Sequence, residues 1–249
     1  MSDALAAFWP ALVAGLLVTA THAPLGMQVL ARGIVFIDLA VAQIAGLGIV
    51  FAGWAGLAPE GPWAQAAALA AALCGALLFT WTERLWPDVQ EAVIGVAFIV
   101  AANVAILLLA ANPHGAEHLK DLLIGQILWV SAASLAWPLA ATVAILASWF
   151  GLGARLGRVG FYLLFACAVT VSMQLVGLYL VFSTLIVPAL ATRRMGRGRL
   201  QASYALGAAG YAAGLALSAL TDLPAGPLVV CSLTVLGALV FAATRPRLA

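Results

Sequence analysis

The chain has 249 residues, of which 65% are hydrophobic and only 8% are charged, and its mean hydropathy is +1.12. Soluble domains contain about 45–50% apolar and about 25% charged residues. This composition therefore excludes an ordinary soluble protein and indicates a helical protein that crosses the membrane many times. The formal net charge of +2 is too small to indicate a nucleic-acid partner.

At roughly 20 apolar residues per span, the chain has room for about eight or nine transmembrane helices and little else. We expect an all-α polytopic bundle in which residues 1–249 form one transmembrane domain embedded in the lipid bilayer. The run at 178–192 is short, so 158–192 is either two spans or one span followed by a broken half-helix. The expected spans are 7–27, 33–57, 63–82, 90–111, 132–150, 158–176, 178–192, 203–221 and 225–243.

The distribution of basic residues predicts the orientation of these spans. If the arginines that follow residue 192 are cytoplasmic, alternation of the spans leaves only Lys120 of the 11 basic residues outside. Cytoplasmic loops carry the excess of Lys and Arg in membrane proteins. We therefore expect the N-terminus outside and the C-terminus in the cytoplasm. The first apolar run lacks the flanks of a removable signal peptide and is expected to be the first span.

Ionisable side chains inside a bilayer are costly and are candidates for a functional role. Asp38 lies at the start of the second span and Glu91 at the start of the fourth, both near the cytoplasmic ends, where water can reach them. They are interpreted either as part of a polar pathway or gate, or as residues that cap a helix or form an interhelical hydrogen bond. Gln43 lies deeper and either lines the pathway or forms a hydrogen bond between helices.

Other polar residues give weaker signals. His114, Glu117 and His118 offer metal-ligand side chains in the outer loop, where a transient metal contact and an ordinary polar loop are both possible. His22 is interpreted as a structural histidine. The three cysteines, Cys74, Cys167 and Cys231, are far apart in the sequence and are expected to be buried as small apolar residues.

The sequence lacks the motifs of several enzyme classes. No phosphate-binding G-x-x-x-x-G-K-[ST] loop is present, so the chain is not expected to hydrolyse ATP itself. Neither G-x-S-x-G nor H-E-x-x-H occurs, and no aspartate-rich motif for Mg²⁺ is found. The sequence therefore gives little support to a membrane enzyme.

Five short segments give a family resemblance through their order along the chain. They are residues 24–32, 91–95, 121–128, 176–193 and 222–227. In that order they resemble the membrane permeases of bacterial ABC importers for zinc, manganese or iron(II). The fourth segment is similar to the family signature vGxLLvxalLiiPaatAr and the fifth to the turn dlPsGp. Within these two segments the resemblance implies structural roles for Gly177, Pro188, Pro224 and Gly226.

One departure from the family pattern concerns the cargo. Family members typically carry G-D-x-x-S-H-x-x-x-x-G in the second span. Here Gln43 stands in the place of the histidine, and Asp38 is one residue out of register, where Leu39 occupies the family's aspartate position. The resemblance therefore leaves open a different ligand set or a different substrate.

The resemblance implies a homodimer in the bacterial inner membrane, two cytoplasmic ATPase subunits, and a periplasmic or extracellular metal-binding protein. The expected cargo is a divalent metal, with zinc the first candidate, and no stably bound cofactor is expected. The loop after the signature is expected to contact the ATPase, although its arginines could instead fix topology and meet anionic lipid. Those arginines are Arg193, Arg194, Arg197 and Arg199. Alternatives are an importer for a metal chelate or another small solute, and a secondary transporter without ATPases.

Overall fold

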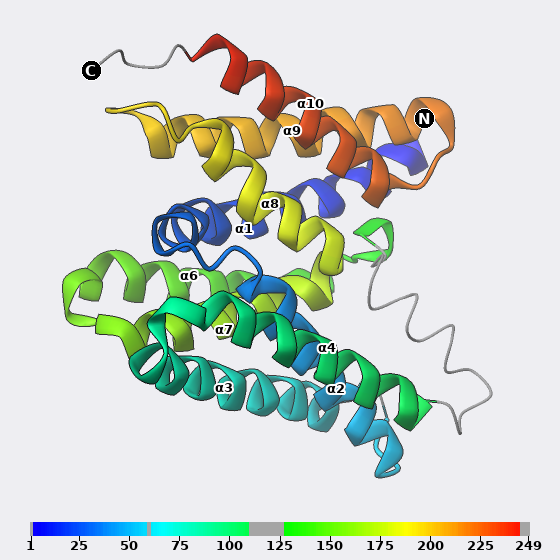
Figure 1. The fold of residues 1–249 in the computed structure, drawn as a ribbon. Helices are drawn as coiled ribbons and strands as arrows, with labels where there is room; N and C mark the ends of the chain where they lie inside the picture. Colours follow the sequence, from blue (N-terminus) through cyan, green and yellow to red (C-terminus); the bar gives the residue numbers. More distant parts are fainter. Residues whose placement is uncertain (1, 59–60, 110–126, 245–249) are drawn as a thin grey trace.

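The computed structural model describes residues 2–58, 61–109 and 127–244 (Figure 1). The described part is helical throughout, as the composition predicts. Its long helices are α1 (Ser2–Arg32), α2 (Ile37–Trp54), α3 (Pro62–Leu85), α4 (Gln90–Leu109), α6 (Ala136–Leu152), α7 (Gly157–Val176), α8 (Leu178–Ala191), α9 (Arg199–Thr221) and α10 (Ala225–Ala243). Short 3-10 helices are η1 (Pro87–Val89), η2 (Ile127–Trp129), η3 (Ala133–Leu135) and η4 (Gly153–Arg155).

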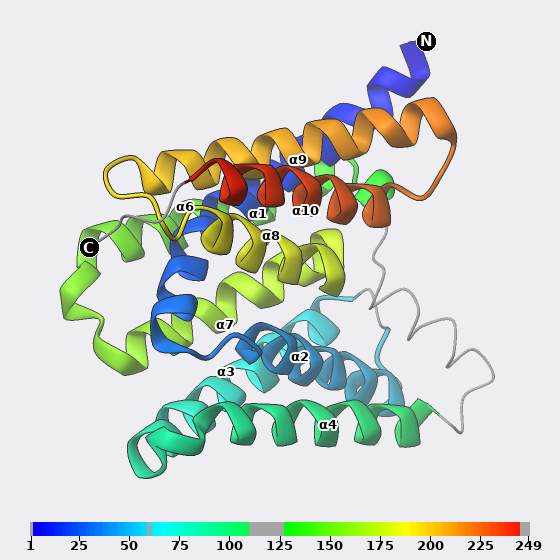
Figure 2. The ribbon, with the colours of Figure 1, turned by 45° about the horizontal axis from the view of Figure 1, so that its top comes forward.

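The helices pack in two groups that share one apolar core. Helices α1, α8, α9 and α10 pack against one another, and α2 packs against α3 and α4 (Figures 1 and 2). Helix α7 contacts α3 of the second group and, together with α6, also contacts α1. The connections α1–α2, α3–α4, α6–α7 and α8–α9 all lie at the same end of the bundle, at the left in Figure 1.

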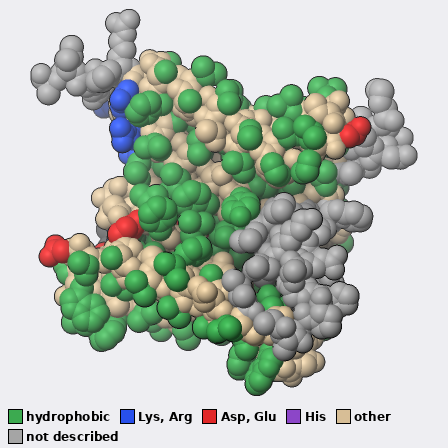
Figure 3. All heavy atoms as spheres, turned by 45° about the vertical axis from the view of Figure 1, so that its right-hand side comes forward, with side chains coloured by type: hydrophobic (Ala, Val, Ile, Leu, Met, Phe, Trp, Pro, Cys, Tyr) green, Lys and Arg blue, Asp and Glu red, His purple; other side chains and the backbone are tan. Residues whose placement is uncertain are grey.

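Eight of the described helices are long and apolar enough to cross a membrane, and they correspond to the predicted spans. Exposed tryptophans mark both ends of the bundle, as they do at membrane interfaces. In α3, Trp63 is 71% exposed and Trp81 is 55% exposed. They are about 27 Å apart along the helix, close to the thickness of the hydrocarbon core of a bilayer, about 30 Å. In Figure 3 apolar side chains cover much of the visible face.

The boundary between the first two spans differs from the prediction, because α1 contains Pro24 and continues beyond residue 27 to Arg32. A proline removes one helical hydrogen bond and leaves the carbonyl four residues earlier without its partner. Here the hydroxyl of Tyr204, on α9, donates to the carbonyl of Ala20 at 3.3 Å. Gly33 ends the helix instead, with a φ of 71° and the paired backbone bonds of a Schellman motif. The predicted ranges 7–27 and 33–57 therefore become 2–32 and 37–54.

The region 158–192 forms two helices that are separated by Gly177 alone. Gly177 has φ 84° and ψ 163°, a conformation that is essentially restricted to glycine. The chain reverses there, so that α8 returns to the end of the bundle from which α7 starts (Figure 1). With its 14 residues, α8 is about 21 Å long and shorter than a full membrane span.

Small residues allow close contact between helices. A Cβ atom at Gly214 would lie 2.3 Å from Cα of Val229, so α9 and α10 touch through their backbones. A Cβ atom at Gly26 would lie 2.0 Å from the carbonyl oxygen of Leu185, which brings α8 against α1 in the same way. Any side chain at these two positions would separate the helices.

The prediction that the cysteines are buried is wrong for two of the three. Cys74 and Cys231 are exposed and Cys167 is partly buried, and all three are free thiols. Their exposed positions lie on membrane-spanning helices, where lipid is as apolar as a protein core. Apolar character in a membrane protein therefore does not distinguish a core position from a lipid-facing one.

Candidate functional site

The candidate site begins at the end of the bundle where the described arginines gather, and its central residue is Glu83. Glu83 lies in the last turn of α3, and its side chain is 15% exposed. Its Oε1 lies 3.6 Å from Nη1 of Arg32, at the end of α1, and its Oε2 lies 3.1 Å from Nε of Arg158, in the first turn of α7. One carboxylate thus joins three helix ends, and we call this group the Glu83 cluster.

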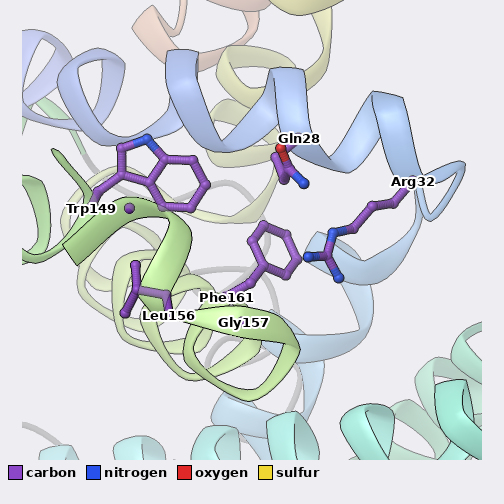
Figure 4. Close-up of a pocket in the computed structure, with 7 residues that line it drawn as sticks. Gln28, Arg32, Trp149, Leu156, Gly157 and Phe161 are labelled. Atoms are coloured by element: carbon purple, nitrogen blue, oxygen red, sulfur yellow. The ribbon is translucent and has the colours of Figure 1, made fainter.

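A pocket of about 390 Å³ opens beside the Glu83 cluster. Arg32 lines it, with its guanidinium carbon 4.2 Å from the centre of the Phe161 ring, which is a cation–π contact. In Figure 4 the guanidinium of Arg32 points toward Phe161. Gln28 extends from α1 above them, and Trp149 lies across the pocket from Arg32. Leu156, Gly153 and Gly157 complete the lining.

Gln90, at the start of α4, connects three helices at the same end. It is 3% exposed. Its Oε1 accepts a hydrogen bond from the Thr82 hydroxyl at 3.0 Å, and its Nε2 donates to the carbonyl of Phe79 at 3.0 Å and to the Tyr162 hydroxyl at 3.5 Å. Gln90 therefore has a structural role that is satisfied by these bonds.

Glu91 binds the turn between α1 and α2. Its Oε1 accepts a hydrogen bond from the backbone N–H of Phe36 at 3.1 Å, whereas its Oε2 is buried without a hydrogen-bond partner. This bond connects α4 to the N-terminus of α2, so Glu91 forms the interhelical hydrogen bond that was one of its interpretations. The second carboxylate oxygen of Glu91 thus has no hydrogen-bond partner among the described residues.

Asp38 lies in the first turn of α2 and is 0% exposed. Both of its carboxylate oxygens are buried without a hydrogen-bond partner. The positive end of the α2 helix dipole favours a negative charge at this position, but a buried carboxylate without a partner is costly. This burial differs from the expected access to water. Gln43, just over one turn further along α2, is partly buried and forms no side-chain hydrogen bond with the described residues.

The arginines that follow α8 form a second basic group at the same end. A pocket of about 450 Å³ is lined by Met27, Leu30 and Ala31 of α1 and by Arg193, Arg194 and Arg199. We call it the arginine pocket. Arg197 lies at the exposed turn before α9 and is not part of its lining.

The family follows from a comparison with known protein families. The model of the ABC 3 transport family matches residues 5–152 and 146–244. The chain belongs to the ABC 3 transport family. Its fold is also similar to two solved structures. One is PsaBC from Streptococcus pneumoniae in complex with Fab, with a TM-score of 0.75, 18% identity, and coverage of 93% of this chain and 89% of that chain.

The second similar structure is an inward-facing conformation of a transporter described as of the metal-chelate ABC type. It has a TM-score of 0.68 and 15% identity, and the match covers 94% of this chain and 82% of that chain. At these identities the two likenesses concern the fold. They confirm that this ABC 3 family member has the helical fold of ABC transporter permeases, as the sequence motifs indicated.

The structure places the remaining predicted residues of this ABC 3 family member at separate locations. Pro188 lies inside α8, and Pro224 immediately precedes α10, whose first turn contains Gly226. His22 is buried in α1, where Nδ1 is 3.0 Å from the carbonyl of Val18 while Nε2 has no partner. The outer-loop residues His114, Glu117 and His118 lie outside the described residues. The same holds for residues 121–126 of the matched segment 121–128. Within the described residues, no group of three or more His, Cys, Asp or Glu is arranged to hold a metal ion.

Sequence reasoning missed Glu83 and Gln90 in this ABC 3 family member. Glu83 stands beside Arg84 just after the third predicted span, so it is not among the charges inside a predicted span. A carboxylate directly beside an arginine at the end of a span is the signal that could have identified it. No signal in the sequence indicates that Gln90, beside the more conspicuous Glu91, is the buried one of the pair.

Proposed function

We propose that this ABC 3 family member is the permease subunit of an importer that translocates a divalent metal across the bacterial inner membrane. Zinc is the first candidate, followed by manganese and iron. The observation that carries the proposal is the family match, which extends over nearly the whole chain. The fold likeness to PsaBC, over 93% of the chain, supports it.

The proposed assembly contains two copies of this chain, two cytoplasmic ATPase subunits and a metal-binding protein on the outer side. ATP hydrolysis takes place on the partner subunits, and this chain supplies the path for the cargo. The concentration of described arginines at one end of the bundle supports placing that end in the cytoplasm, with the N-terminus outside. The turn that contains Arg197 is exposed at this end and is the proposed contact with the ATPase.

Asp38 is the residue proposed to meet the cargo inside the membrane. Its two unpaired oxygens are hard ligands that a divalent cation can use, and the cation would supply the partner that the described residues do not. Glu91 contributes one free oxygen near the start of α4, and Gln43 contributes an amide further along α2. Their proposed roles are transient contacts along the path.

A metal chelate is the second candidate cargo. Gln43 supports it, because glutamine stands where the family resemblance places a histidine, and an amide binds zinc more weakly than an imidazole. The similar structure of the metal-chelate type supports it as well. A chelated metal brings its own ligands and needs fewer from the permease.

Reconstitution tests the proposal. The chain, its candidate ATPase and the binding protein are placed in liposomes, and uptake of radioactive Zn²⁺, Mn²⁺ and Fe²⁺ is compared with uptake of the chelated metals. ATP-dependent uptake of a free ion supports the first candidate, and uptake of chelates alone supports the second. Uptake driven by an ion gradient without ATP would overturn the importer assignment in favour of a secondary transporter.

Substitution of Asp38 tests the path. Asp38→Asn is expected to lower uptake about tenfold or more, because removal of a charged contact costs about 1.5–3 kcal/mol. Asp88→Asn, at an exposed position in η1, provides the matched control and is expected to keep normal uptake. Binding of the ATPase is measured in parallel to verify assembly. Normal uptake by the Asp38 variant would contradict a role in the path and leave this residue only its interaction with the helix dipole.

A further inference from the structure

The arginine pocket differs from the Glu83 cluster in how its charges are balanced. In the Glu83 cluster, one carboxylate lies between two guanidinium groups. In the arginine pocket, Arg199 donates from Nη2 to the carbonyl of Ala189 at 3.1 Å, and Arg194 donates from Nη1 to the carbonyl of Thr244 at 3.4 Å. These partners are neutral.

The aromatic contacts of the pocket do not supply a negative charge either. Arg194 lies 3.9 Å from the centre of the Phe241 ring and Arg193 lies 5.2 Å from it, so two cations share one ring. Nε of Arg199 is buried and has no hydrogen-bond partner. Among the described residues, the ion pairs are those of Glu83. Three like charges therefore line one cavity without a described carboxylate.

We propose that the arginine pocket binds the phosphate headgroup of an anionic phospholipid. Guanidinium groups bind phosphate oxygens through paired, charge-assisted hydrogen bonds, and a phosphate between the three arginines relieves their mutual repulsion. This site is separate from the cargo path and does not depend on the identity of the cargo.

The position of the pocket favours a lipid over a free phosphate ion. Its opposite wall is formed by Met27, Leu30 and Ala31, which are apolar and suit the glycerol and upper acyl region of a lipid. The residues that line the pocket belong to the end of α1, the turn after α8 and the start of α9. Figure 2 shows that α10 also ends on this side of the bundle. Basic groups at this depth attract the anionic lipids of the inner leaflet. Arg197 lies outside the pocket and remains free to contact the ATPase.

Lipid binding to the purified full chain tests the proposal. The chain, alone and delipidated, is mixed with micelles that contain phosphatidylglycerol or phosphatidylcholine, and bound lipid is measured by native mass spectrometry. We expect a preference for phosphatidylglycerol that falls about fivefold for each arginine replaced, from the usual strength of such contacts. The variants are Arg193→Gln and Arg193→Gln/Arg199→Gln. The single variant removes no described hydrogen bond and guards against a folding defect.

Arg84→Gln/Arg155→Gln is the matched control, since it removes two exposed positive charges from the same end and leaves the pocket intact. It is expected to retain the preference of the wild type. An equal loss in this control, or no preference in the wild type, would overturn the proposal. Inorganic phosphate forms a third arm of the experiment, and displacement of phosphatidylglycerol by it at equal phosphorus concentration would identify a free-phosphate site instead. The ATPase is absent throughout, so the result is independent of the proposed coupling contact.

Discussion

At the scale of single residues, one hydroxyl group compensates for the hydrogen bond that α1 lacks at Pro24. Pro24 lacks the N–H that would bond the carbonyl of Ala20, and unpaired carbonyls are costly where lipid replaces water. Tyr204 supplies the missing donor from α9, a helix far away in the sequence. The proline therefore becomes a point of contact between two helices and does not end the first one.

Removal of this hydroxyl tests the interpretation. Tyr204→Phe is expected to lower the free energy of unfolding by about 1 kcal/mol. This is a typical contribution of one hydrogen bond in proteins and lies within the range found between membrane helices. Denaturation in mixed micelles measures the effect. Tyr179→Phe, at an exposed tyrosine, is the matched control and should be nearly neutral. Equal stability of the two variants would show that Ala20 finds another donor.

At the scale of elements, Glu83 connects three helices at the end where the ATPase is proposed to bind. Its oxygens face Arg32 of α1 and Arg158 of α7, while its own backbone belongs to α3. Helix α7 leads through Gly177 into α8, and α8 ends at the arginine pocket. A movement at this end could therefore reach both groups of helices through the Glu83 cluster.

Neutralisation of Glu83 should loosen these three helix ends. Glu83→Gln is expected to cost about 1–3 kcal/mol of stability, because it leaves two guanidinium groups without their anion. Glu83→Gln should lower the unfolding free energy by less in a protein in which Arg158 is already replaced. A double-mutant cycle measures this coupling. Asp88→Asn removes one exposed acidic charge from the following turn and should have little effect. Additive losses for Glu83 and Arg158 would show that the pair does not interact.

Some features of these elements depend on one short stretch of the sequence, and others depend on residues from distant parts of the chain. The spans could be predicted because each depends on its own run of apolar residues. The end of α1 also has a local signal, Arg32-Gly33, although the predicted span stops at residue 27. The burial of Asp38 could not be predicted, since it depends on which face of α2 meets the surrounding helices. The partners of Glu83 come from distant parts of the chain and have no local signature.

At the scale of the whole molecule, charge is distributed very unevenly between the two ends. The described arginines follow α1, α3, α6 and α8, and these connections lie together at one end (Figure 1). The opposite end carries the turn Asp222-Leu223-Pro224 between α9 and α10. The rule that cytoplasmic loops hold most of the positive charge then predicts the orientation of the complete bundle.

Labelling at the two ends of α9 tests this orientation. Arg197→Cys and Leu223→Cys place reporters at exposed positions just before and just after the same helix, in a background where Cys74, Cys167 and Cys231 are replaced by serine. A membrane-impermeant maleimide added to intact cells is expected to label Leu223→Cys at once and Arg197→Cys only after permeabilisation. The loss of one arginine should not reverse the bundle, because the remaining ones hold the same bias. Labelling of Arg197→Cys alone in intact cells would contradict the predicted topology and with it the proposed contact between this end and the ATPase.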